Sequence, residues 1–213
     1  MPKGGFLTLA DELRRIVERM RLYAPIREGG TKQQKELGAL RDLLESMARG
    51  GDSPYLDPRV WQDDPPDCIA ETTCGALVAF EVTEFVSQEA IALSEKARPG
   101  RKAAPKNDRM VYRGWDRAGF LERIAAILKE KDSKTFKGGP YAEMVVLIHT
   151  DEPLLLRHDC ESWLSDRQFG PFQRLTSAYF LCPYEPHVGY PFVRVRFGGV
   201  QPASADSRQG RKL

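Results

Sequence analysis

The chain lacks the features that mark membrane proteins, secreted proteins and two common groups of enzymes. No apolar stretch approaches the roughly 20 residues that span a bilayer, and the first residues, Met-Pro-Lys-Gly-Gly-Phe, lack the apolar core of a signal peptide. Gly-Lys-Thr/Ser and Gly-x-Ser-x-Gly are both absent, which argues against a phosphate-binding loop and a serine-hydrolase elbow. We therefore expect a cytoplasmic protein without a membrane partner.

Cysteine, histidine and net charge are also scarce. The four cysteines and three histidines show no short paired spacing, which argues against a zinc knuckle and a disulfide framework and predicts reduced, mostly buried thiols. The formal net charge is only +2, from 32 basic and 30 acidic residues. Any affinity for nucleic acid must therefore come from local clustering of charge.

The patterns that are present alternate between helix and strand. Helical spacing of apolar residues predicts helices over 8–23, 31–48, 84–96 and 115–131, with a helical piece at 159–169. Residues 144–149 and 178–182 are continuous apolar runs typical of strands buried on both faces, and 191–197 alternates like an edge strand. This order predicts an α/β fold, a mixed central sheet flanked by helices. We expect a helical extension over 1–30, the α/β domain over 31–200 and a disordered tail over 201–213.

A hairpin after the Pro- and Asp-rich connection at 51–66 carries the most informative residues. If its turn centres near Cys74, Asp67 and Glu81 face each other across the two strands. Strand alternation then puts Val78, Phe80 and Val82 on one face and Ala79, Glu81 and Thr83 on the other. Two carboxylates about 5 Å apart need one proton or a hard cation such as Mg²⁺ between them. The alternative is a surface hairpin whose acids face water.

A basic segment follows at 98–113, with one acidic residue among its charges. Cationic side chains beside an acidic metal site suit a phosphodiester substrate, because they hold the backbone while the metal acts on one phosphate. The alternative is a solvated insertion. The candidate nucleic-acid-binding residues are Arg98, Arg101, Lys102, Lys106, Arg109 and Arg113.

The order of these features resembles the PD-(D/E)XK phosphodiesterase superfamily, which has the restriction-endonuclease-like fold. The resembling elements are a helix with a glutamate, a Pro-Asp start to a hairpin, a glutamate on its second strand, then a helix and a buried strand. The resemblance implies that Asp67 and Glu81 bind Mg²⁺ or Mn²⁺, with the main-chain carbonyl of Val82 as a third ligand. It also implies that Glu36, on the helix at 31–48, supports the site.

Thr83 departs from the superfamily pattern, because it stands where a catalytic lysine is expected. That lysine orients or polarises the attacking water, work that a hydroxyl performs only in part. In similar proteins the lysine migrates to a neighbouring helix, so Lys96 or Lys129 is expected to replace it.

The sequence thus predicts a metal-dependent endonuclease, with DNA favoured over RNA as its partner and a homodimer allowed. Two alternatives stay open at this point. In the first, the chain is a catalytically inactive nuclease-fold module that binds nucleic acid or protein. In the second, it has an unrelated α/β fold and its acids are ordinary surface charge.

Overall fold

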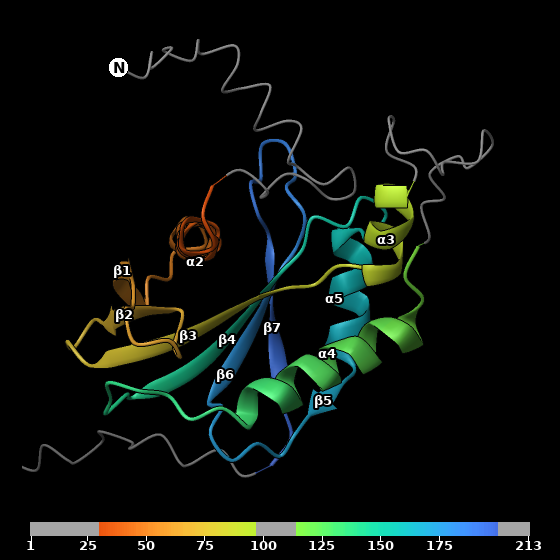
Figure 1. Ribbon diagram of the computed structural model, residues 1–213. Helices are drawn as coiled ribbons and strands as arrows, with labels where there is room; N and C mark the ends of the chain where they lie inside the picture. The colour runs from red at the N-terminus through yellow and green to blue at the C-terminus, as the bar shows by residue number, and fades with distance from the viewer. Residues whose placement is uncertain (1–29, 97–113, 200–213) are drawn as a thin grey trace, which may run out of the picture.

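The computed structural model describes residues 30–96 and 114–199 (Figure 1). Within these residues, seven strands form one mixed sheet in the order β1-β2-β3-β4-β6-β7-β5, and four helices accompany it. This is the α/β class that the sequence predicts. None of the helices in the described ranges has both the length and the apolar character needed to cross a membrane. The predicted helix at 8–23, the basic segment 98–113 and the tail 201–213 lie outside the described residues.

The sheet changes from antiparallel to mixed pairing at its third strand. β1 to β2 and β2 to β3 are antiparallel, β3 to β4 and β4 to β6 are parallel, and β6 to β7 is antiparallel. The strands are β1 (Tyr55–Val60), β2 (Cys68–Thr72), β3 (Leu77–Glu84), β4 (Glu143–His149), β5 (Gln168–Phe169), β6 (Ser177–Leu181) and β7 (Phe192–Phe197). The helices are α2 (Lys32–Arg49), α3 (Gln88–Lys96), α4 (Arg117–Asp132) and α5 (Arg157–Ser165).

Two hydrophobic cores lie on opposite faces of this sheet, as Figure 1 shows by the positions of α2 on one side and α4 and α5 on the other. The α2 core contains Leu40 and Leu43 packed on Phe80 of β3 and Leu147 of β4. The second core packs α4 and α5 against the opposite residues of β4 and β6, with Phe180 fully buried. β4 and β6 are therefore buried on both faces, as their continuous apolar runs predict.

Local sequence signals account for the starts of the two long helices. Thr31 caps α2 by accepting a hydrogen bond from the Gln34 amide, while the Gln34 side chain accepts one from the Thr31 amide. Asp116 caps α4 by accepting a 2.7 Å hydrogen bond from the amide of Gly119. These caps satisfy backbone N–H groups that have no partner inside the helix.

The hairpin has the predicted register. Cys68 pairs with Phe80 and Ala70 with Val78, so one further step places Asp67 opposite Glu81. The turn is held by Thr72, whose backbone and hydroxyl accept hydrogen bonds from the amides of Gly75 and Ala76. The face assignments are also confirmed, because Val78, Phe80 and Val82 all belong to the α2 core.

Two strands differ from the prediction. β1 lies within the stretch expected to be a connection, where it pairs only with β2 and has a register irregularity between Leu56 and Arg59 that contains Pro58. Edge strands and irregular pairs tolerate proline because its missing N–H is not needed there. β7 was expected at an edge, but the two-residue β5 pairs with its end at Arg196 and Phe197. The helix expected from residue 84 begins at Gln88, because β3 continues to Glu84 in parallel pairing with β4.

Candidate metal centre

Three carboxylates meet at the start of the β2–β3 hairpin. Oxygens of Asp64, Asp67 and Glu81 all lie within 4.8 Å of one another. The Asp67 carboxylate is held in place by its Oδ2 atom, which accepts a 2.9 Å hydrogen bond from the Val82 amide. β2 begins at Cys68, so its backbone does not reach the Val82 amide of β3. The Asp67 side chain accepts that hydrogen bond instead. The start of β2 thus positions Asp67 directly beside Glu81.

Burial makes this arrangement energetically demanding. Glu81 is fully buried and Asp67 is 6% exposed, while Asp64 is exposed. A buried carboxylate that lacks a partner is costly, because it loses its hydration. The site must therefore supply compensating positive charge.

Two lysines from the end of α4 supply that charge to Glu81. Nζ of Lys131 lies 2.9 Å from Glu81 Oε2, and Nζ of Lys134, just beyond the helix, lies 2.7 Å from the same oxygen. Lys131 is itself buried, with 8% of its surface exposed. Burial acts to lower the pKa of Lys134, but its hydrogen bond to Glu81 and the negative charge there outweigh this effect and raise the pKa. Lys134 is therefore a protonated group at neutral pH.

The other oxygen of Glu81 is unusual. Its Oε1 atom is buried and has no hydrogen-bond partner among the described residues. Buried carboxylate oxygens normally have a partner, and an orphaned one next to two further carboxylates fits a hard cation. The residues of the site thus offer an all-oxygen ligand set with one unsatisfied oxygen.

Lys32, in the first turn of α2, connects the remaining acids. Its Nζ atom lies 3.3 Å from Asp67 Oδ1, 3.3 Å from Glu36 Oε1 and 3.5 Å from Asp64 Oδ2. Glu36 is 8% exposed, and burial followed by the negative charge of Asp67 raises its pKa to about 7. Glu36 therefore reaches the acidic group from α2, which is the place predicted for a supporting helical acid.

A small cleft opens beside these residues at the carboxyl ends of β3 and β4, the usual position of ligand sites in α/β sheets. Its volume is about 150 Å³. It is lined by Lys32, Lys35, Glu36, Val82, Thr83, Glu84 and His149.

The remaining predicted site residues fall into two groups. Val82 and Thr83 both line the cleft, and the N–H of Val82 points toward Asp67. In a strand the N–H and C=O of one residue point to the same side, so the Val82 carbonyl also faces the Asp67 side. Lys96 and Lys129 are exposed, and neither makes a described contact with Asp67 or Glu81. All six arginines and lysines of the basic segment lie outside the described residues.

The lysine that reaches Glu81 is therefore not the predicted one. Lys129 and Lys131 are two residues apart on α4, which places them about 200° apart around the helix. Lys131 follows Ile124 by seven residues and Ile127 by four, so it lies on the buried stripe that also carries these two side chains. This spacing was the available signal, because a lysine on an apolar stripe needs a buried partner.

Lys32, Lys134 and Asp64 were also missed. Asp64 lies three residues before Asp67 in an Asp-Asp-Pro-Pro-Asp run, and only the path of the chain through the two prolines brings the acids together. Lys134 follows the end of α4, where sequence periodicity carries no directional information. No sequence pattern indicates that Asp64 or Lys134 belongs to the site.

Comparisons with known proteins identify no relative for the chain. No protein-family model matches the sequence, and searches of curated proteins and solved structures give no match. The functional argument therefore rests on the geometry of the site.

Proposed function

We propose that the chain is a divalent-cation-dependent phosphodiesterase, an endonuclease that acts on nucleic acid, with DNA favoured over RNA. The observation that carries the proposal is the meeting of Asp64, Asp67 and Glu81 within 4.8 Å of one another. Two oxygens on opposite sides of a hard cation are about 4–5 Å apart at ligand distances of about 2.0–2.6 Å. The acidic group therefore has the dimensions of a Mg²⁺ or Mn²⁺ site.

The chain's own residues have distinct roles in this proposal. A cation bound by the three acids would lower the pKa of a bound water and neutralise charge on a phosphate. The Val82 amide orients the Asp67 carboxylate through its hydrogen bond to Oδ2. Lys131 and Lys134 supply ammonium groups on the same face of the sheet as Thr83, where the superfamily resemblance requires a lysine. A protonated lysine there can donate to a phosphate oxygen or to the attacking water.

The order of elements also supports the proposal. α2 carries Glu36, β2 and β3 form the hairpin with Asp67 and Glu81, and α4 leads to the buried strand β4. This is the sequence of elements by which the chain resembles the PD-(D/E)XK superfamily. The migration of a lysine to a neighbouring helix is likewise consistent with that resemblance.

A second candidate function is favoured by the same lysines. Lys32, Lys131 and Lys134 already pair with Asp67 and Glu81, so the acidic group has substantial charge compensation without a cation. Such a network suits an inactive nuclease-fold module that binds nucleic acid or protein. Metal affinity separates the two candidates, because the inactive module needs no cation.

The first prediction concerns cation binding. Mg²⁺ or Mn²⁺ at about 100 times its Kd should raise Tm by about 5–10 °C, since a ligand that binds only the folded state stabilises it. Asp64→Asn and Asp67→Asn should each lose most of this shift. Asp63→Asn is the matched control, because Asp63 is an exposed neighbour outside the acidic group, and it should keep the shift.

Differential scanning fluorimetry in EDTA and in metal measures these shifts. If neither cation changes the Tm of the wild-type protein, the result would favour the inactive module. Cleavage of single- and double-stranded DNA and RNA in Mg²⁺ and Mn²⁺ then tests catalysis, with Asp67→Asn and Glu81→Gln expected to be inactive. Metal-dependent cleavage that persists unchanged in these two variants would place the active site elsewhere.

A further inference from the structure

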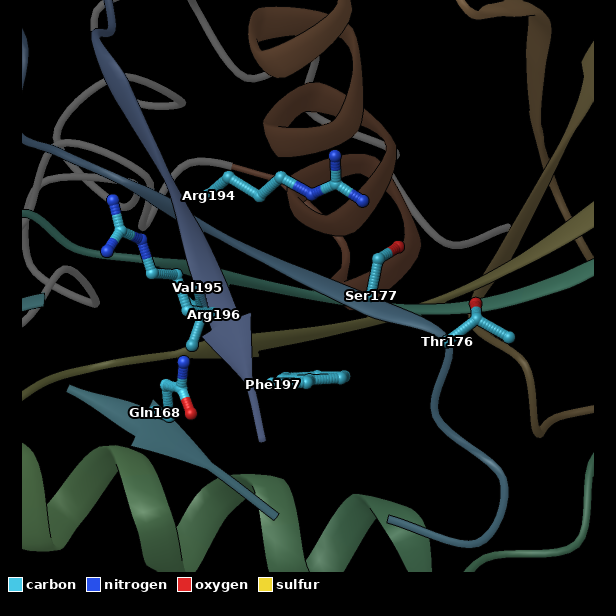
Figure 2. Close-up of a pocket in the computed structure, with 7 residues that line it drawn as sticks. All are labelled: Gln168, Thr176, Ser177, Arg194, Val195, Arg196 and Phe197. Carbon is cyan, nitrogen blue, oxygen red and sulfur yellow. The ribbon is translucent and has the colours of Figure 1, made fainter. Parts of the chain in front are cut away.

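A second polar pocket lies on the sheet at β5, β6 and β7, away from the acidic group. Its volume is about 450 Å³, a size typical of small-molecule sites. Its lining residues, drawn in Figure 2, are Gln168, Thr176, Ser177, Arg194, Val195, Arg196 and Phe197. Two arginines and several hydrogen-bonding side chains therefore line one open part of the sheet.

Strand register places the polar members of this pocket on one face. Tyr179 and Leu181 belong to the α2 core, so Ser177, two residues before Tyr179, has its side chain on the same face of β6. Arg194 pairs with Tyr179, and Arg196 lies opposite Ser177 when the β6–β7 register is continued by one step. Arg194 is thus a diagonal neighbour of Ser177, within reach of a long side chain.

The pocket lies on the opposite face of the sheet from Glu81. Glu81 pairs with Val146, whose side chain belongs to the core beneath α4 and α5. The neighbouring residue Val145 belongs to the α2 core and pairs with Ser177. The pocket and the candidate metal centre are therefore separated by the thickness of the sheet and by two strand spacings, about 10 Å.

Ser177 gives the most direct indication of a ligand. The residue is 4% exposed, and its hydroxyl is buried without a hydrogen-bond partner among the described residues. An unsatisfied hydroxyl destabilises the folded protein, so its retention in a pocket wall suits a ligand that accepts its proton. Figure 2 shows the side chains of Ser177 and Arg194 reaching to the same side of the strands.

The two arginines supply uncompensated positive charge. Both are exposed, and neither forms an ion pair with any carboxylate in residues 30–96 or 114–199. Figure 2 shows the two guanidinium groups reaching to opposite sides of β7, with Arg194 on the side of Ser177 and Gln168 of β5 beside Arg196. Guanidinium groups recognise phosphate through paired, charge-assisted hydrogen bonds.

We propose that this pocket binds a phosphate group, held by the guanidinium group of Arg194 and the hydroxyl of Ser177, with Arg196 adding positive charge at the pocket wall. The phosphate belongs either to a small molecule or to the backbone of a nucleic acid, and the two sources share the same contacts. The site does not depend on the proposed nuclease activity, because none of its residues contacts the acidic group.

Isothermal titration calorimetry of the full chain with inorganic phosphate, in EDTA and at constant ionic strength, tests the proposal. Wild type should show saturable binding at one site. Arg194→Gln should weaken it by about 10-fold or more, because it removes a charged donor. Arg41→Gln is the matched control, since it removes the same charge from an exposed position on α2 and should leave the affinity unchanged.

Ser177→Ala separates a ligand-binding role from a structural one. Removing an unsatisfied buried hydroxyl should leave the Tm of the phosphate-free protein unchanged or raise it, while the affinity for phosphate falls. Unsaturable heats, or equal affinities in wild type and Arg194→Gln, would overturn the proposal.

Titrations with a 5′-mononucleotide and a short oligonucleotide, again in EDTA, distinguish the two sources. Oligonucleotide binding that depends on Arg194 and competes with phosphate identifies the nucleic-acid backbone. Binding of phosphate or mononucleotide alone, with the same dependence on Arg194, identifies a small-molecule phosphate. If none of the three ligands depends on Arg194, the pocket is not a phosphate site.

Discussion

Glu81 is a buried carboxylate that lies at the centre of the candidate metal site. It is fully buried, accepts from two lysines at one oxygen and has no described partner at the other. A carboxylate in this position is stable only while its cations remain in place. The same requirement makes the site responsive to the removal of either lysine.

The buried lysine provides the corresponding prediction. Lys131→Met should lower the free energy of unfolding by about 3 kcal/mol in EDTA, because breaking a buried pair leaves a charge uncompensated. Saturating Mg²⁺ should restore part of this loss by neutralising Glu81. Urea denaturation measures both effects. Lys129→Met is the control two residues away, and its exposed side chain predicts a change within about 0.5 kcal/mol.

A Lys131→Met protein as stable as wild type in EDTA would mean that Lys134 alone compensates Glu81. Lys134→Met should then show the larger loss. If neither single variant changes stability, the ion pairs of Glu81 contribute little to the folded state.

Glu36 predicts a pH dependence of stability in the metal-free protein. Its pKa is raised from the ordinary glutamate value of 4.5 to about 7, chiefly by burial and then by the negative charge of Asp67. The unfolded chain therefore releases this proton at lower pH than the folded one. Stability from this group is fully present below about pH 4.5 and is lost as pH rises to about 7.

Glu36→Gln should remove that dependence and raise stability at pH 8 by about 1–3 kcal/mol in EDTA. Urea denaturation at pH 5 and pH 8 measures the difference between the two proteins. An equal pH dependence in wild type and variant would contradict the assignment. Glu45→Gln, an exposed change on the same helix, should leave the dependence intact.

At the scale of elements, hydrogen bonds connect the end of α4 to the segment before β6. The Asp132 carboxylate accepts hydrogen bonds from the amides of Gln173, Arg174 and Leu175. Arg174 in turn donates to the carbonyl of Lys134 at 2.6 Å and to the Thr135 hydroxyl at 2.7 Å. These contacts hold the backbone from which Lys134 reaches Glu81.

Asp132→Asn should therefore cost about 1–3 kcal/mol at pH 7, because one neutral amide oxygen accepts less well from three backbone N–H groups. Burial acts to raise the pKa of Asp132, but these N–H groups outweigh it and lower the pKa. Stability from this carboxylate is thus present above its unfolded pKa, near 3.8, and lost as pH falls through the lower folded pKa.

Denaturation at pH 7 and pH 3 should show a smaller difference for Asp132→Asn than for wild type. Asp166→Asn is the control, because Asp166 is an exposed aspartate whose ion pair with Arg117 has a 3.8 Å separation. A loss of the same size in the control would show that general surface charge, rather than the Asp132 contacts, controls acid stability.

Elements with strong periodicity were the ones that sequence could predict. α2 and α4 follow apolar stripes and differ from their predicted bounds by one or two residues, and β4 and β6 follow apolar runs. β1 carries Pro58 and β5 has only two residues, so neither gives a periodic signal. These strands depend on their neighbours in the sheet, which a single sequence does not reveal.

At the scale of the whole molecule, one sheet separates the two sets of residues for which we propose functions. The acidic group lies at the start of the hairpin, and the arginine pocket lies on the α2 face at β6 and β7. Asp67 and Glu81 were predictable because hairpin symmetry is a short-range property of the sequence. Lys32 and Arg194 were not, because their proximity to other site residues arises from packing between segments far apart in the chain. The apolar stripe of α4 indicates that Lys131 is buried, but it does not identify Glu81 as its partner.

The β2–β3 turn has a consequence for the whole site, although it lies several residues from it. The number of residues in that turn determines which residue of β3 lies opposite Asp67. With the present turn Cys68 pairs with Phe80, so Glu81 lies opposite Asp67. One inserted glycine after Gly75 would shift the pairing by a residue and turn one strand's side chains to the opposite face, unless a bulge absorbs it. Such an insertion should abolish the metal-dependent Tm shift, whereas Thr73→Ser should preserve it. We therefore expect the length of this turn to constrain the proposed metal site as strictly as the identity of either acid.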